Sequence, residues 1–271
     1  MRLFDFKPYE HTEATVTAYL HDVIKNREEK PFREKYPSVV VCPGGGYCFC
    51  SPREADPVVY EYLSKGYNVF LLNYSVGENA SNFNPLKELS STVMEIRKNA
   101  NAWNCDTDKI AVCGFSAGGH LCASLATLWN NERFLAKFDN QGGLNKPNAV
   151  ILGYAAISSS EFGHKSSIMK VSGEESGEFY DFFSLEKRVT PETAPCFIWH
   201  TLTDPAVPVQ NALVFADALR KNDVTFEMHI FPTGSHGLSV CNNETNSKNK
   251  HTAQWVDLSV KFLDLMFDFE Y

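Results

Sequence analysis

The 271-residue chain has no cluster of basic residues and no long apolar run. Its 25 lysines and arginines are outnumbered by 33 aspartates and glutamates, which gives a net charge of −8. A chain of this charge lacks the electrostatic attraction to nucleic acid and anionic lipid that a basic surface provides. No apolar run approaches the length of a transmembrane helix. We therefore expect neither a nucleic-acid partner nor a membrane partner.

The N-terminal sequence lacks the features of an export signal. Residues 1–10 contain no continuous apolar segment and no small-residue cleavage site, so we expect a cytoplasmic protein. The eight cysteines are then expected to be reduced. Their spacings, such as Cys48-Phe-Cys50, match no common zinc pattern, and we expect no metal site.

The order of apolar segments predicts one α/β domain over residues 1–271. Hydrophobic residues make up 44% of the chain, which suits a large soluble core. Expected strands lie at 14–20, 38–42, 68–73, 109–113, 149–153, 196–200 and 225–231, and expected helices at 55–65, 86–103, 119–130, 208–222 and 252–268. This alternation predicts a mostly parallel, doubly wound sheet flanked by helices, with its site at the carboxyl ends of the strands. Residues 156–192 have weak periodicity and are expected to form a lid-like insertion.

Residues 114–118, Gly-Phe-Ser-Ala-Gly, are the most informative motif. They lie between an expected strand and an expected helix, which is the context in which Gly-x-Ser-x-Gly forms a nucleophile elbow. Glycine at 114 and 118 suits a turn too tight for side chains. The turn would expose the hydroxyl of Ser116 beside the N–H groups of a helix start, which favour a developing negative charge.

A serine hydroxyl needs a base, and His236 is the best candidate. It lies in a small-residue loop just past the strand expected at 225–231, where a side chain can reach the end of the sheet. The other histidines are expected in strands, on the flank of the elbow helix or in surface loops: His11, His21, His120, His164, His200, His229 and His251.

Asp204 is the candidate for orienting the imidazole. It follows the strand expected at 196–200 and gives the chain order Ser…Asp…His. The alternative is a turn or N-cap aspartate, because Asp204 precedes Pro205 and Asp-Pro marks turns. Asp181 and Asp223 are weaker candidates, since neither follows a strong strand.

Residues 44–46, three glycines, follow the strand expected at 38–42 and are the candidate oxyanion loop. We expect the N–H of Ala117 and one or two N–H groups from Gly45, Gly46 or Tyr47 to bind the oxyanion. A phosphate-binding loop is excluded because no Gly-Lys-Ser/Thr follows. Arg53 and Glu54 follow this loop; a salt bridge between them could order it, but a solvated surface pair is the favoured interpretation.

These motifs together resemble the α/β-hydrolase esterases. The resemblance rests on residues 43–47, 51–55, 66–75, 114–120, 204–208 and 234–237, and extends from about residue 38 to residue 262. It is greatest to the small bacterial esterase/lipase branch that includes acetyl esterases and acetylxylan esterases. In place of the His-Gly-Gly-Gly of hormone-sensitive-lipase-like relatives, this chain has Cys42-Pro43 before its glycines.

The resemblance implies a serine carboxylesterase of the α/β-hydrolase fold that needs no cofactor. Its substrates would be small short-chain esters, above all acetyl esters, including O-acetylated sugars or xylan-derived oligosaccharides. Tyr47 and Phe115 are expected to contact the substrate, and Phe49 and the aromatic residues of the insertion offer further flat faces. Such residues suit a hydrophobic lid equally well.

Several alternatives stay open. A peptidase or lipase of the same fold could use the same residues, although the propeller domain common in such peptidases would not fit this length. A non-catalytic binding module could retain the fold. A homo-oligomer is compatible with the sequence.

Overall fold

One sheet organises the computed structural model, which describes residues 1–269, and its eight strands lie in the order β1-β2-β4-β3-β5-β6-β7-β8. The strands are β1 (Arg2–Phe6), β2 (Thr15–Leu20), β3 (Tyr36–Cys42), β4 (Asn68–Asn73), β5 (Cys105–Phe115), β6 (Ala149–Gly153), β7 (Cys196–Thr201) and β8 (Phe226–Phe231). β2 pairs antiparallel with both β1 and β4, and the remaining neighbours pair parallel. The predicted mostly parallel sheet is therefore confirmed.

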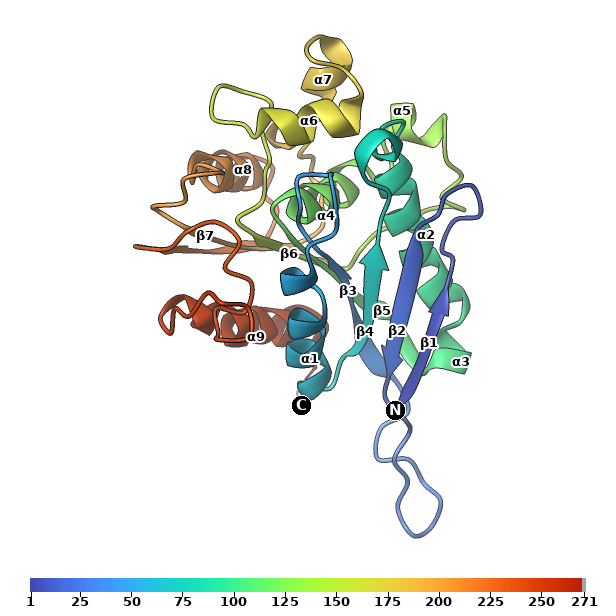
Figure 1. Ribbon diagram of the computed structural model, residues 1–271. Coiled ribbons are helices and arrows are strands. Elements are labelled where there is room, and N and C mark those ends of the chain that lie inside the picture. The colour runs from blue at the N-terminus through green and yellow to red at the C-terminus, as the bar shows by residue number, and fades with distance from the viewer. Residues whose placement is uncertain (270–271) are drawn as a thin grey trace.

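Helices cover both faces of this sheet (Figure 1). They are α1 (Asp56–Ser64), α2 (Asn84–Lys98), α3 (Ala100–Trp103), α4 (Ala117–Leu128), α5 (Glu132–Leu135), α6 (Lys165–Ser172), α7 (Glu178–Phe182), α8 (Gln210–Lys221) and α9 (Trp255–Phe267). α1 and α9 contribute to one hydrophobic core, and α2, α4 and α8 contribute to the other. None of the helices within residues 1–269 is long and apolar enough to cross a membrane.

The central strands are buried on both sides, which explains their continuous apolar sequences. Along β3, Val40 belongs to the core beneath α2 and α4, whereas Val39 and Val41 belong to the core beneath α1 and α9. Each such side chain contributes about 1.5–3 kcal/mol by leaving water. The residues on both faces of such a strand therefore need to be apolar, as in parallel sheets generally.

Two local predictions needed correction. β1 is an additional edge strand, paired with β2 from Arg2↔Leu20 to Phe6↔Val16. Its charged and partly exposed residues give no continuous apolar signal. The helix expected over 86–103 is divided, because α2 ends at Lys98 and α3 begins at Ala100.

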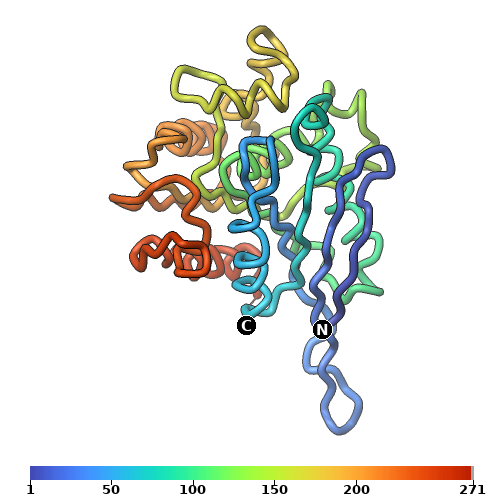
Figure 2. Tube along the Cα trace, in the orientation of Figure 1, coloured from blue at the N-terminus to red at the C-terminus, as the bar shows by residue number. Residues whose placement is uncertain are grey.

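The insertion, residues 156–192, contains α6, α7 and a short 3₁₀ helix at Leu185–Lys187. Figure 1 shows α6 and α7 at the end of the molecule toward which the β4 arrow points, and the tube in Figure 2 shows residues 22–35 projecting from the opposite end. Phe179, Phe182 and Phe183 pack on one another and on Phe83. The aromatic residues of the insertion thus extend the core beneath α2 and α4.

Candidate active site

Ser116 occupies the turn between β5 and α4 in a strained backbone conformation. Its φ is 52° and its ψ is −115°, a region that costs a non-glycine residue about 1–3 kcal/mol. Its N–H donates to the carbonyl of Gly153 at 3.0 Å, and its own carbonyl accepts from the N–H groups of His120 and Ala156. These bonds hold the serine at the carboxyl end of β5 with its side chain outside the helix.

The glycines of the motif are required by close packing. A Cβ on Gly118 would lie 2.1 Å from the carbonyl oxygen of Cys42 and 2.4 Å from that of Pro43. A Cβ on Gly114 would lie 2.2 Å from the carbonyl oxygen of Gly118. The start of α4 therefore sits directly against the end of β3, with no room for a side chain between them.

The structure brings Ser116, His236 and Asp204 into one hydrogen-bonded line. His236 Nε2 lies 2.8 Å from Ser116 Oγ, and His236 Nδ1 lies 2.7 Å from Asp204 Oδ2. The Asp204 side chain is fully buried, whereas 23% of the His236 side chain is exposed. The line thus runs from a buried carboxylate to an imidazole that solvent can reach.

Asp204 makes the contacts expected for both of the roles considered for it. Its Oδ1 accepts the N–H groups of Ala206 and Val207, each at 2.9 Å, so this oxygen does cap a turn. Burial of the carboxyl opposes its ionisation, but hydrogen bonds from His200 and His236 outweigh burial and hold the pKa of Asp204 well below its usual range. An ionised carboxylate accepts from His236 Nδ1, which leaves Nε2 free to accept from the Ser116 hydroxyl.

The glycine-rich loop lies beside the serine. A Cβ on Gly44 would stand 3.1 Å from Ser116 Cβ, and Gly45 and Gly46 have φ values of 125° and 63° that favour glycine. In the part of the chain that the structure describes, the N–H groups of Gly45, Gly46 and Ala117 donate to no protein acceptor. The expected oxyanion donors are therefore available around Ser116.

A family model described as BD-FAE matches residues 22–219, which is more than half of the chain. The chain belongs to the BD-FAE family. Its sheet also agrees with solved α/β-hydrolase structures, which confirms the fold class predicted from the sequence.

Three relatives illustrate the similarity of this BD-FAE protein to known enzymes. It is 38% identical to endo-1,4-beta-xylanase B of Butyrivibrio fibrisolvens over 84% of this chain and 35% of the relative. It is 28% identical to the acetylxylan esterase of Xylanibacter ruminicola over 74% of this chain and 41% of the relative. A solved acetyl ester-xyloside bifunctional hydrolase from Caldicellulosiruptor lactoaceticus superposes with a TM-score of 0.79 at 31% identity, covering 96% of this chain and 91% of the other.

These relatives confirm the resemblance to esterases of this fold. The chain spans only about a third to two fifths of the length of the two curated relatives.

The two residues predicted to contact the substrate, Tyr47 and Phe115, have fully buried side chains in the BD-FAE protein. The Tyr47 hydroxyl donates to His120 Nδ1 at 2.9 Å, and Phe115 packs on the rings of Tyr154 and Trp255. The geometry therefore gives both side chains a packing role in the interior. A substrate contact by Tyr47 would have to come from its main chain.

His120 is a connecting residue that the sequence interpretation placed only on a helix flank. Its Nε2–H donates to the carbonyl of Phe183 at 3.0 Å, so Nδ1 is the acceptor for Tyr47. Complete burial lowers the pKa of His120 to about 4, which keeps the ring neutral at pH 7. The elbow helix is thereby joined to the oxyanion loop on one side and to the insertion on the other.

The interpretation of Arg53 and Glu54 as a solvated pair was wrong. Glu54 is only 3% exposed, and its Oε2 accepts the N–H of Gly44 at 2.8 Å. Arg53 donates to the carbonyl of Gly237 at 2.6 Å, beside His236. Both side chains therefore hold loops of the site, each by a separate bond.

His164 comes from the insertion and lies over the oxyanion loop. Its Cε1 and the Oγ of Ser167 are each 3.9 Å from the position that a Cβ on Gly46 would take. His164 Nδ1 lies 2.8 Å from Ser167 Oγ, and burial together with the nearby His236 lowers the pKa of His164. This contact could not be predicted from the sequence, because the insertion has no regular pattern.

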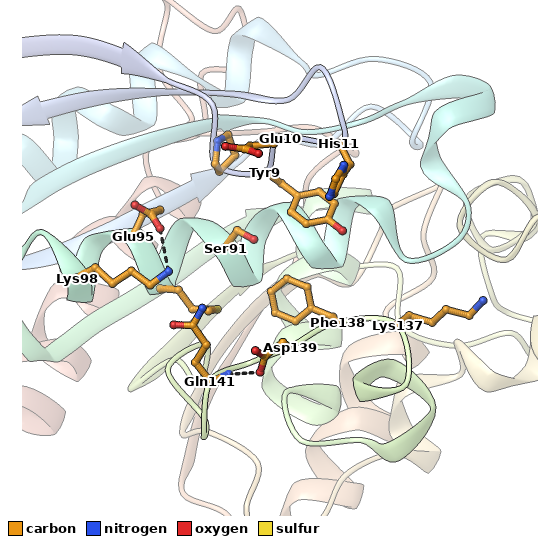
Figure 3. Close-up of a pocket in the computed structure, with 12 residues that line it drawn as sticks. Tyr9, Glu10, His11, Ser91, Glu95, Lys98, Lys137, Phe138, Asp139 and Gln141 are labelled. Carbon is orange, nitrogen blue, oxygen red and sulfur yellow. Dashed lines mark hydrogen bonds and ion pairs between the residues drawn. The ribbon is translucent and has the colours of Figure 1, made fainter.

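A separate cavity of about 320 Å³ lies near the turn that follows β1 (Figure 3). Ser116, Asp204 and His236 do not line it. Figure 3 shows the rings of Tyr9 and Phe138 next to each other, with centroids 6.2 Å apart, and Glu95 paired to Lys98. Because the cavity carries charges of both signs, it has no clear preference for a ligand of either sign, and the triad remains the candidate site.

Within residues 1–269, no group of three or more His, Cys, Asp or Glu is arranged to hold a metal ion.

Proposed function

We propose that this BD-FAE protein is a serine carboxylesterase that hydrolyses short-chain acyl esters, above all acetyl esters. The observation that carries the proposal is the continuous line from Ser116 Oγ through His236 to Asp204, with separations of 2.8 Å and 2.7 Å. A nucleophile, a base and an orienting acid in this order are the requirements of acyl transfer by serine.

In the first half of the reaction, Ser116 Oγ attacks the ester carbonyl carbon while its proton passes to His236 Nε2. The carbonyl oxygen gains a negative charge, which the N–H groups of Gly45, Gly46 and Ala117 stabilise. Asp204 stabilises the imidazolium. The tetrahedral intermediate then breaks its bond to the alcohol oxygen, which leaves with the proton from His236.

In the second half, a water molecule gives a proton to His236 Nε2 and attacks the acyl carbon. The bond to Ser116 Oγ breaks, the serine recovers the proton, and the carboxylic acid is released. Every proton moves through one imidazole nitrogen, which is the nitrogen that faces Ser116.

The acetylated-carbohydrate part of the proposal draws on the printed names of the relatives, a xylanase, an acetylxylan esterase and an acetyl ester-xyloside hydrolase. Phe49 adds a local argument, because it is 56% exposed and its ring lies 3.3 Å from the position of a Cβ on Gly45. An exposed aromatic ring at the edge of the oxyanion loop offers a flat apolar face to a sugar.

The decisive experiment is Ser116→Ala, assayed with p-nitrophenyl acetate and checked by circular dichroism. Hydrolysis is expected to vanish while the spectrum is unchanged, and persistence of wild-type activity would refute the role of Ser116. Labelling by a fluorophosphonate probe separates an enzyme from a non-catalytic binding module.

A substrate panel then tests the acyl group and the alcohol. Acetyl and propionyl p-nitrophenyl esters are expected to react faster than octanoyl or longer esters, and a preference for long chains would favour a lipase. Acetate release from acetylated xylo-oligosaccharides supports the carbohydrate substrate, whereas cleavage of peptide nitroanilides would favour a peptidase. The cytoplasmic location and a homo-oligomer stay predictions, which cell fractionation and light scattering would test.

A further inference from the structure

Glu54 is a buried carboxylate that the reaction sequence above does not use. Its Oε2 accepts the N–H of Gly44 at 2.8 Å, and its Oε1 accepts the hydroxyl of Tyr154 at 2.6 Å. Both acceptor atoms are thus occupied by donors from different parts of the chain. A buried carboxylate is costly unless it is bonded in this way, so the arrangement calls for a reason beyond packing.

The first bond fixes the oxyanion loop. Gly44 precedes the two glycines whose N–H groups are free, and a Cβ on Gly44 would lie 2.7 Å from Glu54 Oε2 and 3.1 Å from Ser116 Cβ. The carboxylate and the elbow therefore both lie against the loop at Gly44. By holding the N–H of Gly44, the carboxylate fixes the peptide between Pro43 and Gly44, which directly precedes the peptides that carry the N–H groups of Gly45 and Gly46.

The second bond reaches the loop that carries the base. The Tyr154 hydroxyl accepts the N–H of Ser239 at 2.9 Å, three residues after His236, and the ring of Tyr154 stands edge-on to His236 with centroids 4.9 Å apart. Burial and the adjacent Glu54 raise the pKa of Tyr154, so that its hydroxyl keeps the proton it donates. Arg53 adds a parallel connection by donating to the carbonyl of Gly237.

We propose that Glu54, acting through Gly44 and Tyr154, is a positioning residue that holds the oxyanion loop and the His236 loop at a fixed position relative to each other. The two loops lie about 190 residues apart in the chain, and each supplies groups that must act on the same carbonyl. Misplacement of such groups by about 1 Å can cost 10²-fold in rate. This inference rests on the proposed role of Ser116 and His236.

Glu54→Gln and Tyr154→Phe test it in the full chain. Gly44 and Tyr154 donate to different oxygens of Glu54, and glutamine replaces one of these acceptors by an NH₂ donor, whereas phenylalanine removes the hydroxyl between Glu54 and Ser239. Each variant is expected to lower kcat for p-nitrophenyl acetate by about 10- to 100-fold while KM changes by less than about 3-fold, because the bonds matter most where the oxyanion forms. The double variant should lose little more than the worse single variant, since the two side chains act as one unit.

Glu88→Gln is the matched control. Glu88 is likewise buried and accepts a backbone N–H and a hydroxyl, both from Ser75, and these two bonds do not involve Gly44, Tyr154 or the triad. It is expected to lower the melting temperature about as much as Glu54→Gln while keeping kcat within about 3-fold of the wild type. An equal loss of kcat in Glu88→Gln would mean that the effect is general destabilisation and would overturn the positioning role.

The experiment also separates this inference from the proposed function. If Ser116→Ala remains active, the proposed function fails. If Ser116→Ala is inactive while Glu54→Gln and Tyr154→Phe both keep kcat near the wild-type value, the positioning role of Glu54 alone is wrong. Inhibition by a trifluoromethyl ketone, whose adduct carries an oxyanion, gives an independent readout. Its inhibition constant should rise in parallel with the loss of kcat/KM in the two variants.

Discussion

Asp204→Asn separates the orienting role of this side chain from its role in the turn. Asparagine keeps an oxygen that can accept the N–H groups of Ala206 and Val207, as Oδ1 of Asp204 does at 2.9 Å. The amide NH₂ then faces His236 Nδ1, where Oδ2 stood at 2.7 Å. Because an NH₂ group can only donate, Nδ1 has to accept, and the imidazole proton moves to Nε2. The fold is preserved while the tautomer is reversed.

The expected loss of activity is large. A protonated Nε2 at 2.8 Å from Ser116 Oγ cannot accept the proton of the hydroxyl. In serine protease triads the same exchange lowers kcat about 10⁴-fold, which corresponds to about 5.4 kcal/mol of transition-state stabilisation. Removal of the carboxylate charge, which Asp204 keeps because its pKa is lowered, also removes the stabilisation of the imidazolium.

The assay is kcat for p-nitrophenyl acetate near pH 7.5, with thermal melting measured on the same samples. Asp217→Asn is the control, because Asp217 forms an exposed pair with Arg220 and Lys221 and should leave kcat within about 2-fold. A folded Asp204→Asn enzyme that keeps more than about a tenth of the wild-type kcat would refute the tautomer argument.

Three further substitutions test other parts of the site. Gly118→Ala brings a Cβ to 2.1 Å from the carbonyl of Cys42, so that α4 has to shift by about 1 Å and kcat should fall about 100-fold; unchanged kinetics would show that the elbow can relax. His164→Ala should raise KM for an acetylated xylo-oligosaccharide about 5-fold, the value of one hydrogen bond, with p-nitrophenyl acetate kinetics almost unchanged, and His11→Ala is the control. His120 has a pKa of about 4 when folded and about 6.5 when unfolded, so the unfolded chain binds more protons and stability falls as the pH drops through this range. Urea unfolding should show a loss of about 3 kcal/mol between pH 7 and pH 4 that His120→Gln lacks, and equal pH dependence in both proteins would contradict it.

The central sheet could be predicted because burial on two faces leaves a continuous apolar sequence. β3, β4 and β6 each carry such a run, and their bounds differ from the predicted ranges by at most two residues. β1 could not be predicted in this way, because an edge strand that is exposed or partly exposed needs no apolar pattern. Its position is fixed by pairing with β2, which is a long-range property.

The triad positions could be proposed because each follows a strand in an order typical of the fold. Ser116 has a local motif, and Asp204 and His236 follow β7 and β8. The error on Tyr47 and Phe115 arose because proximity in sequence to the glycines and the serine does not determine the direction of a side chain. Both rings turn into the interior, where Tyr47 meets His120 and Phe115 meets Trp255.

Tyr154 and His164 gave no interpretable signal, and Glu54 was interpreted as half of a solvated pair with Arg53, because the contacts of all three lie outside any local pattern. A carboxylate after an arginine is usually a solvated pair, and the bonds from the N–H of Gly44 and the hydroxyl of Tyr154 make Glu54 different. A chain of bonds from Gly44 to Ser239 crosses three loops, and no local periodicity records it. Such contacts require the tertiary structure.

The residues of the elbow motif make packing contacts as well as supplying the candidate nucleophile, and this affects how their variants can be interpreted. Gly118 contacts the end of β3, Ser116 binds Gly153 and Ala156 through its main chain, and His120 joins the oxyanion loop to the insertion. Nearly any substitution among residues 114–120 is therefore expected to lower activity, whether or not the side chain takes part in the reaction. Loss of activity alone cannot assign a chemical role here. A role in catalysis follows only when kcat falls while KM and the melting temperature remain close to the wild-type values, because packing defects change all three.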